Sequence, residues 1–72
     1  MTKDEFLERL KDVLQREDDL TFDMLLKDLD EWDSLAIMAT TAFLDRDFGV
    51  KTIFSDYKDM KTVADIATKA GL

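Results

Sequence analysis

The chain contains no cysteine, no histidine and no proline, and it has only two glycines. Without cysteine it can form no disulfide, and without cysteine or histidine it lacks the usual ligands of a zinc site. The same absences remove the cysteine and histidine nucleophiles and the histidine general base of many enzymes. Its 72 residues suit a single domain, 1–72, near the lower size limit for a stable core. We therefore expect one small domain that is not an enzyme.

Long apolar runs are also missing, and residues 1–5 lack the basic region and apolar stretch of a secretory signal. Seventeen acidic and 10 basic residues leave a net charge of −7, which repels the phosphates of nucleic acids. The hydrophobic content of 46% is too high for a disordered tail. These features predict a cytoplasmic monomer that binds no nucleic acid and does not insert into membranes.

The negative charge is concentrated in one segment. Between Glu17 and Asp33 there are eight acidic residues and one base, Lys27, so this segment carries 1 − 8 = −7. It lacks a sustained apolar period, and we expect a long loop with a short helical turn near 23–27. Loops longer than about 12–15 residues in a compact domain are usually functional. The acidic loop, defined as residues 17–33, is either a solvated segment that keeps the protein soluble or a landing site for a basic partner.

Apolar spacing and capping residues predict three helices. Thr2 and Glu5 form a capping box before the first helix. The second helix is expected over 34–48, between a cap at Asp33 or Ser34 and Gly49. The last helix is expected to start at Thr62, and one irregular turn lies near 55–59. The predicted fold class is all-α: a small four-helix bundle, with three main helices plus one short helix, and a long first loop.

Each helix has an apolar stripe that we expect to be buried. The stripe of the first helix is Phe6, Leu7, Leu10, Val13 and Leu14. That of the second helix is Ile37, Thr41, Leu44 and Phe48. That of the last helix is Val63, Ile66, Ala67 and Ala70. On the second helix, Ala36, Ala39 and Phe43 then fall on another side, at 100° per residue.

Metal binding and carboxylate catalysis are both disfavoured. An EF-hand loop starting at Asp28 needs glycine at its sixth position and glutamate at its twelfth, where this chain has Asp33 and Ala39. Acid/base catalysis by carboxylates needs a burying pocket to shift a pKa, and a core this small leaves little room for one. We predict no metal site and no catalytic residue.

The tripeptide Asp33-Ser34-Leu35 opens the second helix at the end of the acidic loop. By itself it reads as a helix cap followed by a core leucine. Together with the stretches 29–35, 47–50 and 60–66, it makes the chain resemble the acyl carrier protein family over essentially its whole length. The resemblance implies that Ser34 is the attachment site of 4′-phosphopantetheine, a covalent cofactor donated by coenzyme A through a phosphopantetheinyl transferase.

In that case the arm's thiol carries a thioester-linked acyl or aminoacyl group between loading and transferring enzymes. The chain departs from the fatty-acid type of the family, which has a glycine before the motif and acids two and five residues after the serine. Here Trp32 precedes the motif and Ala36 and Ala39 follow it. We therefore expect a stand-alone carrier in a specialised biosynthetic pathway. The residues expected to recognise partners are Asp30, Glu31, Asp33, Leu35, Met38, Ala39, Phe43 and Asp45.

Three points remain open from the sequence. Phe43 either packs on a neighbouring loop or contacts a partner. Family resemblance places cargo between the second and third helices, near Leu44, Ile53 and Phe54, and the polarity of Thr40 and Thr41 favours short or polar cargo. The alternative function is an unmodified carrier-like interaction domain, which binds another protein through the acidic loop and the face of the second helix.

Overall fold

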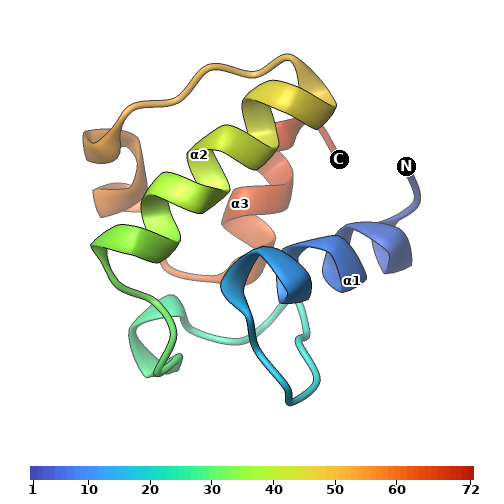
Figure 1. Cartoon of the computed structure of the whole chain (residues 1–72), viewed down its shortest axis with the longest axis vertical. Coiled ribbons are helices and arrows are strands. Elements are labelled where there is room, and N and C mark those ends of the chain that lie inside the picture. The colour runs from blue at the N-terminus through green and yellow to red at the C-terminus, as the bar shows by residue number, and fades with distance from the viewer.

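The computed structural model describes all 72 residues and consists of helices joined by loops (Figure 1). There is no strand, only an isolated bridge between Leu25 and Thr62. This confirms the predicted all-α class with three main helices and short helical turns. The elements are α1 (Lys3–Leu14), the 3-10 helix η1 (Leu26–Asp28), α2 (Ser34–Phe48), the 3-10 helix η2 (Phe54–Asp59) and α3 (Val63–Ala70).

Short-range hydrogen bonds set the starts of the helices. At α1 the Glu5 N–H donates to the Thr2 hydroxyl at 3.1 Å, and the Thr2 N–H donates to the Glu5 carboxylate at 3.2 Å. At α3 the same reciprocal pair joins Thr62 and Asp65, at 3.3 and 3.0 Å. The capping box at Thr2 and Glu5 confirms the sequence prediction. Gly49 ends α2 with φ +67°, a left-handed conformation that favours glycine.

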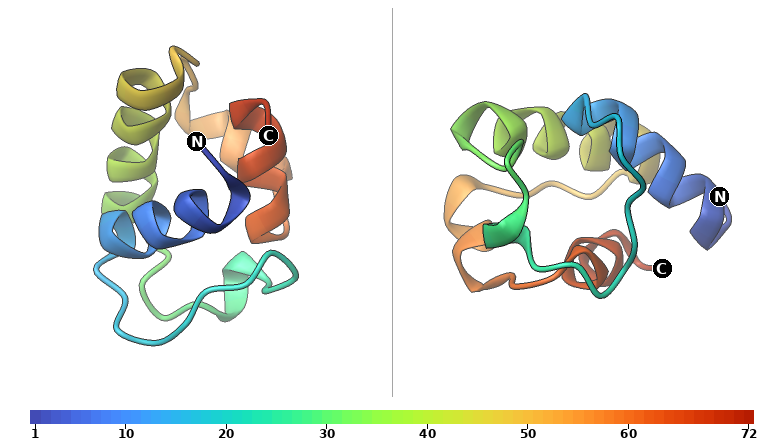
Figure 2. Two further views of the ribbon diagram at one scale, coloured as in Figure 1. Left: turned by 90° about the vertical axis from the view of Figure 1, so that its right-hand side faces the viewer. Right: turned by 90° about the horizontal axis from the view of Figure 1, so that it is seen from below.

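The ring of Phe6 in α1 is fully buried at the centre of an aromatic cluster. In Figure 2 (left), α1 runs crosswise to α2 and α3. The Phe6 ring centre lies 5.8 Å from that of Phe43, 5.9 Å from that of Phe48 and 6.3 Å from that of Phe22. Aromatic pairs at such separations add to the energy of apolar burial. This cluster joins α1, α2 and the acidic loop in one core.

The buried face of α2 differs from the predicted one. Its buried residues are Ala36, Thr40, Phe43 and Leu44. Of the predicted stripe, Leu44 is buried and Phe48 packs half-buried against the core, but Ile37 and Thr41 are only half-buried. Compared with the predicted orientation, the helix is therefore turned about its axis so that Thr40 and Phe43 face the core. The other two predicted stripes are confirmed in their main residues: Phe6, Leu10, Leu14, Val63, Ile66, Ala67 and Ala70 are all buried.

Backbone hydrogen bonds tie the acidic loop to the start of α3. The Leu26 N–H donates to the Lys61 carbonyl at 2.8 Å, and the Val63 N–H donates to the Met24 carbonyl at 3.0 Å. The Ala64 N–H donates to the Phe22 carbonyl at 2.9 Å. The loop thus passes beneath the bundle, as the lower part of Figure 2 (left) shows, and supplies acceptors for the first N–H groups of α3. This path brings its far end to the start of α2.

Candidate functional site

Ser34 is the first residue of α2, and it is exposed. One carboxylate oxygen of Asp33 accepts the Ala36 N–H at 2.8 Å, and the Asp33 carbonyl accepts the Ile37 N–H at 3.0 Å. Asp33 is therefore the N-cap, one of the two alternatives that the sequence left open. No group of the chain accepts the N–H of Ser34 or of Leu35. The serine hydroxyl thus stands beside two free backbone donors at the positive end of a helix dipole.

Glu31 fixes the end of the acidic loop to α1. An Arg16 Nη donates to Glu31 Oε1 at 2.9 Å, and the side chains of this ion pair are only 15% and 26% exposed. Hydrogen bonding to its own backbone N–H and to Arg16 holds the pKa of Glu31 below its ordinary value of 4.5. The carboxylate is therefore ionised at neutral pH and held by the guanidinium.

Trp32, the residue after Glu31, holds the chain to η2. Its ring lies against Tyr57 of η2, with the ring centres 6.1 Å apart. The Tyr57 hydroxyl shares a buried hydrogen bond of 2.7 Å with the Thr52 hydroxyl, which holds the tyrosine ring in place. Two consecutive residues, Glu31 and Trp32, therefore anchor the chain to α1 and to η2. The backbone that presents Ser34 is held from both sides.

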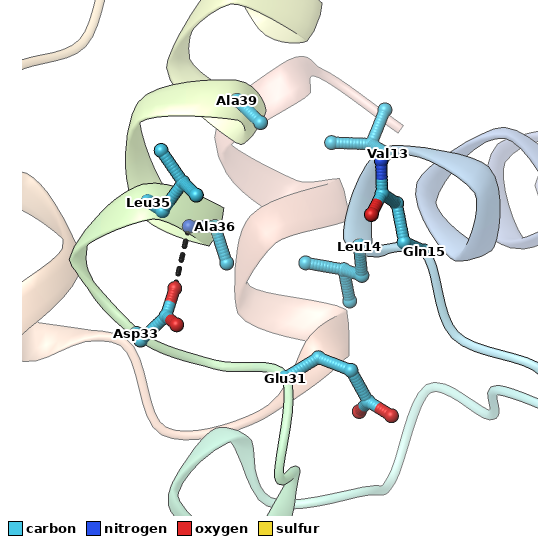
Figure 3. A pocket seen from close by; sticks show the side chains of 8 residues that line it. All are labelled: Val13, Leu14, Gln15, Glu31, Asp33, Leu35, Ala36 and Ala39. Atoms are coloured by element: carbon cyan, nitrogen blue, oxygen red, sulfur yellow. Dashed lines mark hydrogen bonds between the residues drawn. The ribbon is translucent and has the colours of Figure 1, made fainter.

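A pocket of about 330 Å³ opens between the end of α1 and the first turns of α2 (Figure 3). We call it the α1–α2 pocket. In Figure 3 the side chains of Leu14 and Ala36 point toward one another across it, and Glu31 and Asp33 lie at one rim. Five of its eight lining residues are apolar. The lining residues are Val13, Leu14, Gln15, Glu31, Asp33, Leu35, Ala36 and Ala39.

Further large apolar side chains are exposed on α2 and at the start of η2. The large apolar side chains here are exposed: Leu35 by 72%, Met38 by 65%, Ile53 by 66% and Phe54 by 48%. We call these four residues the apolar patch. A smaller groove of about 260 Å³, the α2–η2 groove, is lined by Ile37, Met38, Thr41 and Phe54. No charged residue lines this groove.

The predicted recognition residues fall into three groups. Asp30, Asp33, Leu35, Met38 and Asp45 are exposed and available to a partner. Glu31 and Ala39 are half-buried, the first in its ion pair with Arg16 and the second in the wall of the α1–α2 pocket. Phe43 is only 1% exposed. A partner contact by Phe43 is therefore wrong, because its ring packs against Phe6 and Phe48 in the core.

The expected cargo region also needs correction. Leu44 is fully buried, so it lines no open groove, whereas Ile53 and Phe54 are exposed. The Thr40 hydroxyl lies in the core without a hydrogen-bond partner. The Thr41 hydroxyl donates to the Ile37 carbonyl at 2.8 Å. Thr41 still lines the α2–η2 groove, and its oxygen can accept a hydrogen bond, so the preference for short or polar cargo stays a prediction.

Sequence reasoning did not identify Arg16 as the anchor of Glu31, nor Val13, Leu14 and Gln15 as walls of a pocket. Val13 and Leu14 belong to the apolar stripe of α1, which indicates burial and not an opening. The one local signal was the position of Arg16 beside the acidic loop. Nothing in a single sequence places the end of α1 next to the start of α2.

The arrangement offers an exposed hydroxyl beside two backbone N–H groups that can stabilise an anion. The adjacent carboxylate, that of Asp33, uses one oxygen to cap α2. A phosphodiester on Ser34 fits this donor set, since its charge would face two free N–H groups and the helix dipole. No three carboxylates converge into a group that could hold a metal ion. None of the helices is both long and apolar enough to cross a bilayer.

Comparisons with known proteins identify no relative: no family model, no curated protein and no solved structure matches the chain.

Proposed function

We propose that the chain is a stand-alone acyl or aminoacyl carrier in which Ser34 receives 4′-phosphopantetheine from coenzyme A. The observation that supports this most directly is the exposed Ser34 hydroxyl at the first residue of α2, beside the free N–H groups of Ser34 and Leu35. A phosphodiester on this hydroxyl would place an anion at the positive end of a 15-residue helix. When bound, the group supplies a thiol for thioester chemistry.

The chain's own residues hold and present this attachment point. Asp33 caps α2, and Glu31 and Trp32 hold the preceding backbone to α1 and η2. The serine would therefore meet a transferase in a defined position with an exposed hydroxyl. The chain lacks cysteine, so any thiol on the protein would belong to the arm. The catalytic groups for the attachment reaction would come from the transferase.

Two surfaces beside Ser34 suit partner enzymes. The acidic loop carries the whole net charge of −7, which attracts a basic surface and favours rapid encounter. The apolar patch supplies exposed area for contact after encounter. Ala36 and Ala39 place no acid on the first turns of α2. A partner would therefore meet charge at the loop and apolar side chains along the helix, as we propose for a specialised pathway.

Incubation with a broad-specificity phosphopantetheinyl transferase, Mg²⁺ and coenzyme A tests the proposal. Intact-protein mass spectrometry should show one added phosphopantetheine, and a thiol reagent should detect one thiol where the unmodified chain has none. The matched controls are the only two serines: Ser34→Ala should gain no mass, and Ser55→Ala should be modified like the parent. An unmodified parent, or equal modification of Ser34→Ala, would overturn the proposal.

The apolar patch also favours a second function, that of a carrier-like interaction domain that never receives the arm. In that case the acidic loop and the patch would bind another protein without a thioester. The same mass measurement separates the two functions, because only a carrier has to gain the arm. Protein purified from its own host would then have the mass of the unmodified chain.

A further inference from the structure

The α1–α2 pocket has no role in the attachment of the arm to Ser34. We propose that it is the resting site of the pantetheine arm, which folds back against the α1 side of α2 when no partner enzyme holds it. This rests on the proposed modification of Ser34. The position, the lining and the size of the pocket support this assignment.

The position follows from where α1 ends. α1 stops at Leu14, and Gln15 turns the chain away with φ +55°, so α1 does not extend alongside the first turn of α2. The uncovered space is the pocket. Both sequence neighbours of Ser34, Asp33 and Leu35, line it. An arm attached to Ser34 therefore begins at the edge of the pocket and needs no change in the protein to enter it.

The lining matches the chemistry of pantetheine. The arm carries a geminal dimethyl group, a hydroxyl and two amide N–H groups, and it is uncharged beyond its phosphate. Leu14, Ala36 and Ala39 offer apolar surface for the methyl groups. Asp33 keeps one carboxylate oxygen free for a donor, since the cap uses the other. The Gln15 amide at the opposite rim can both donate and accept.

The charges at the rim favour the neutral arm inside the pocket and keep the phosphate outside it. Glu31 and Asp33 bring two negative charges to one rim, and Arg16 neutralises one of them. A second anion is therefore disfavoured inside the pocket, and the phosphate should stay at the free N–H groups of Ser34 and Leu35. The neutral arm beyond it meets no such penalty and gains hydrogen-bond acceptors.

The α2–η2 groove suits the arm less well. It is smaller, at about 260 Å³ against about 330 Å³. Its only polar side chain is Thr41, whose hydroxyl already donates to the Ile37 carbonyl. The Thr41 oxygen can still accept one hydrogen bond, but the other polar groups of an arm lying there would lose water without gaining partners, which is unfavourable. The volume of the α1–α2 pocket falls within the range of about 300–1,000 Å³ typical of small-molecule sites.

Isotope-filtered NMR on the modified protein tests the assignment, with a ¹³C,¹⁵N-labelled chain and an unlabelled arm. The geminal methyl protons of the arm should show contacts with the methyl groups of Leu14, Ala36 and Ala39. The Gln15 side-chain amide should shift between the unmodified and the modified protein. Contacts with Ile37 or Thr41 instead, or none beyond the neighbours of Ser34, would overturn the assignment.

A variant whose larger side chain fills the pocket tests the same assignment. Ala39→Leu places a larger side chain in the pocket wall, and the contacts from the arm should weaken several-fold. Ala42→Leu makes the same change at an exposed position of α2 that lines no pocket described above, and it should leave the contacts unchanged. Melting of both unmodified variants checks that each folds. If the transferase adds no mass, both proposals fail; added mass without the predicted contacts overturns the resting site alone.

Discussion

Arg16 at the end of α1 and Glu31 near the end of the acidic loop form an ion pair with a nitrogen–oxygen distance of 2.9 Å. Both side chains are mostly shielded from water, so salt screens this pair less than an exposed one. The pair ties the end of this loop to α1, while Trp32 packs against Tyr57 of η2. It therefore determines how firmly the backbone before Ser34 is held.

Replacing Arg16 with methionine should loosen the loop end, because Glu31 loses its partner. Trp32 is the only tryptophan and directly follows Glu31, so its fluorescence reports the change. We expect emission at longer wavelength, faster quenching by acrylamide and a melting temperature lower by a few degrees. Lys11→Met is the control, since Lys11 pairs with a fully exposed Asp19 at 3.8 Å and such pairs contribute less than about 1 kcal/mol. Equal effects of the two substitutions would contradict the anchoring role.

Asp33 combines a capping role with a negative charge, and two substitutions separate them. Asp33→Ala removes the acceptor of the Ala36 N–H and should lower the free energy of unfolding by about 1 kcal/mol. Asp33→Asn keeps an acceptor oxygen, so its free energy of unfolding should stay within about 0.5 kcal/mol of that of the parent. Both should be modified more slowly by the transferase if the charge is recognised. Denaturant unfolding and the rate of mass gain measure the two effects.

Phe43 and Met38 lie on the same helix and should behave in opposite ways. Phe43→Ala removes a ring from the centre of the core and should cost about 3–5 kcal/mol, enough to unfold much of a small domain. Met38→Ala changes a side chain that is 65% exposed and should leave stability unchanged while slowing transfer to partner enzymes. Circular dichroism and a loading assay distinguish the two. Normal folding of Phe43→Ala would contradict the core assignment.

Charge reversal should weaken partner binding more at the loop than along α2. Asp30 is exposed and makes no ion pair, so its charge is open to a basic partner. Asp45 is also exposed but pairs with Lys51 at 3.4 Å. Asp30→Lys should lower the association rate with a transferase severalfold at low salt, and Asp45→Lys should lower it less. A larger effect at Asp45 would show that the partner approaches along the helix.

The capping box of α3 makes stability depend on pH. Backbone hydrogen bonds from Lys61 and Thr62 lower the pKa of Asp65 below its ordinary value of 3.8. As the pH falls, the unfolded chain binds this proton first, so the stabilisation is complete above about pH 5 and is lost as the pH drops through 3.8 toward the folded pKa. Asp65→Asn should therefore melt below the parent at pH 7, and the gap should shrink by pH 3.

Asp18→Asn is the matched control for this measurement, because Asp18 is exposed and takes part in no hydrogen bond or ion pair. It should melt with the parent at every pH. A gap between parent and Asp65→Asn that stays constant from pH 7 to pH 3 would contradict the assignment.

The helix limits were predictable because they depend on neighbours in the sequence. The second helix was expected over 34–48 and runs over Ser34–Phe48, between Asp33 and Gly49. The capping box at Thr2 was recognised for the same reason. The short turn expected near 23–27 lies instead at Leu26–Asp28, where the chain pairs with the start of α3. That shift reflects a contact between distant segments.

The inward face of α2 was not predictable from spacing. From Leu35 to Leu44 the helix has apolar residues on nearly every side, so the period allows more than one buried stripe. Packing against Phe6 of α1 selects the stripe that contains Phe43. The α1–α2 pocket and the Arg16–Glu31 pair depend on the same placement of α1, which no local signal encodes.

The hydrogen bonds between the acidic loop and the start of α3 join residues 35 to 42 positions apart in the sequence. The amides of Leu26, Val63 and Ala64 can therefore become free only when the two halves of the chain separate, which links the loop to the global unfolding reaction. The loop is thus ordered before any partner arrives. A partner that binds it would order few additional residues, so little conformational entropy would be lost on association.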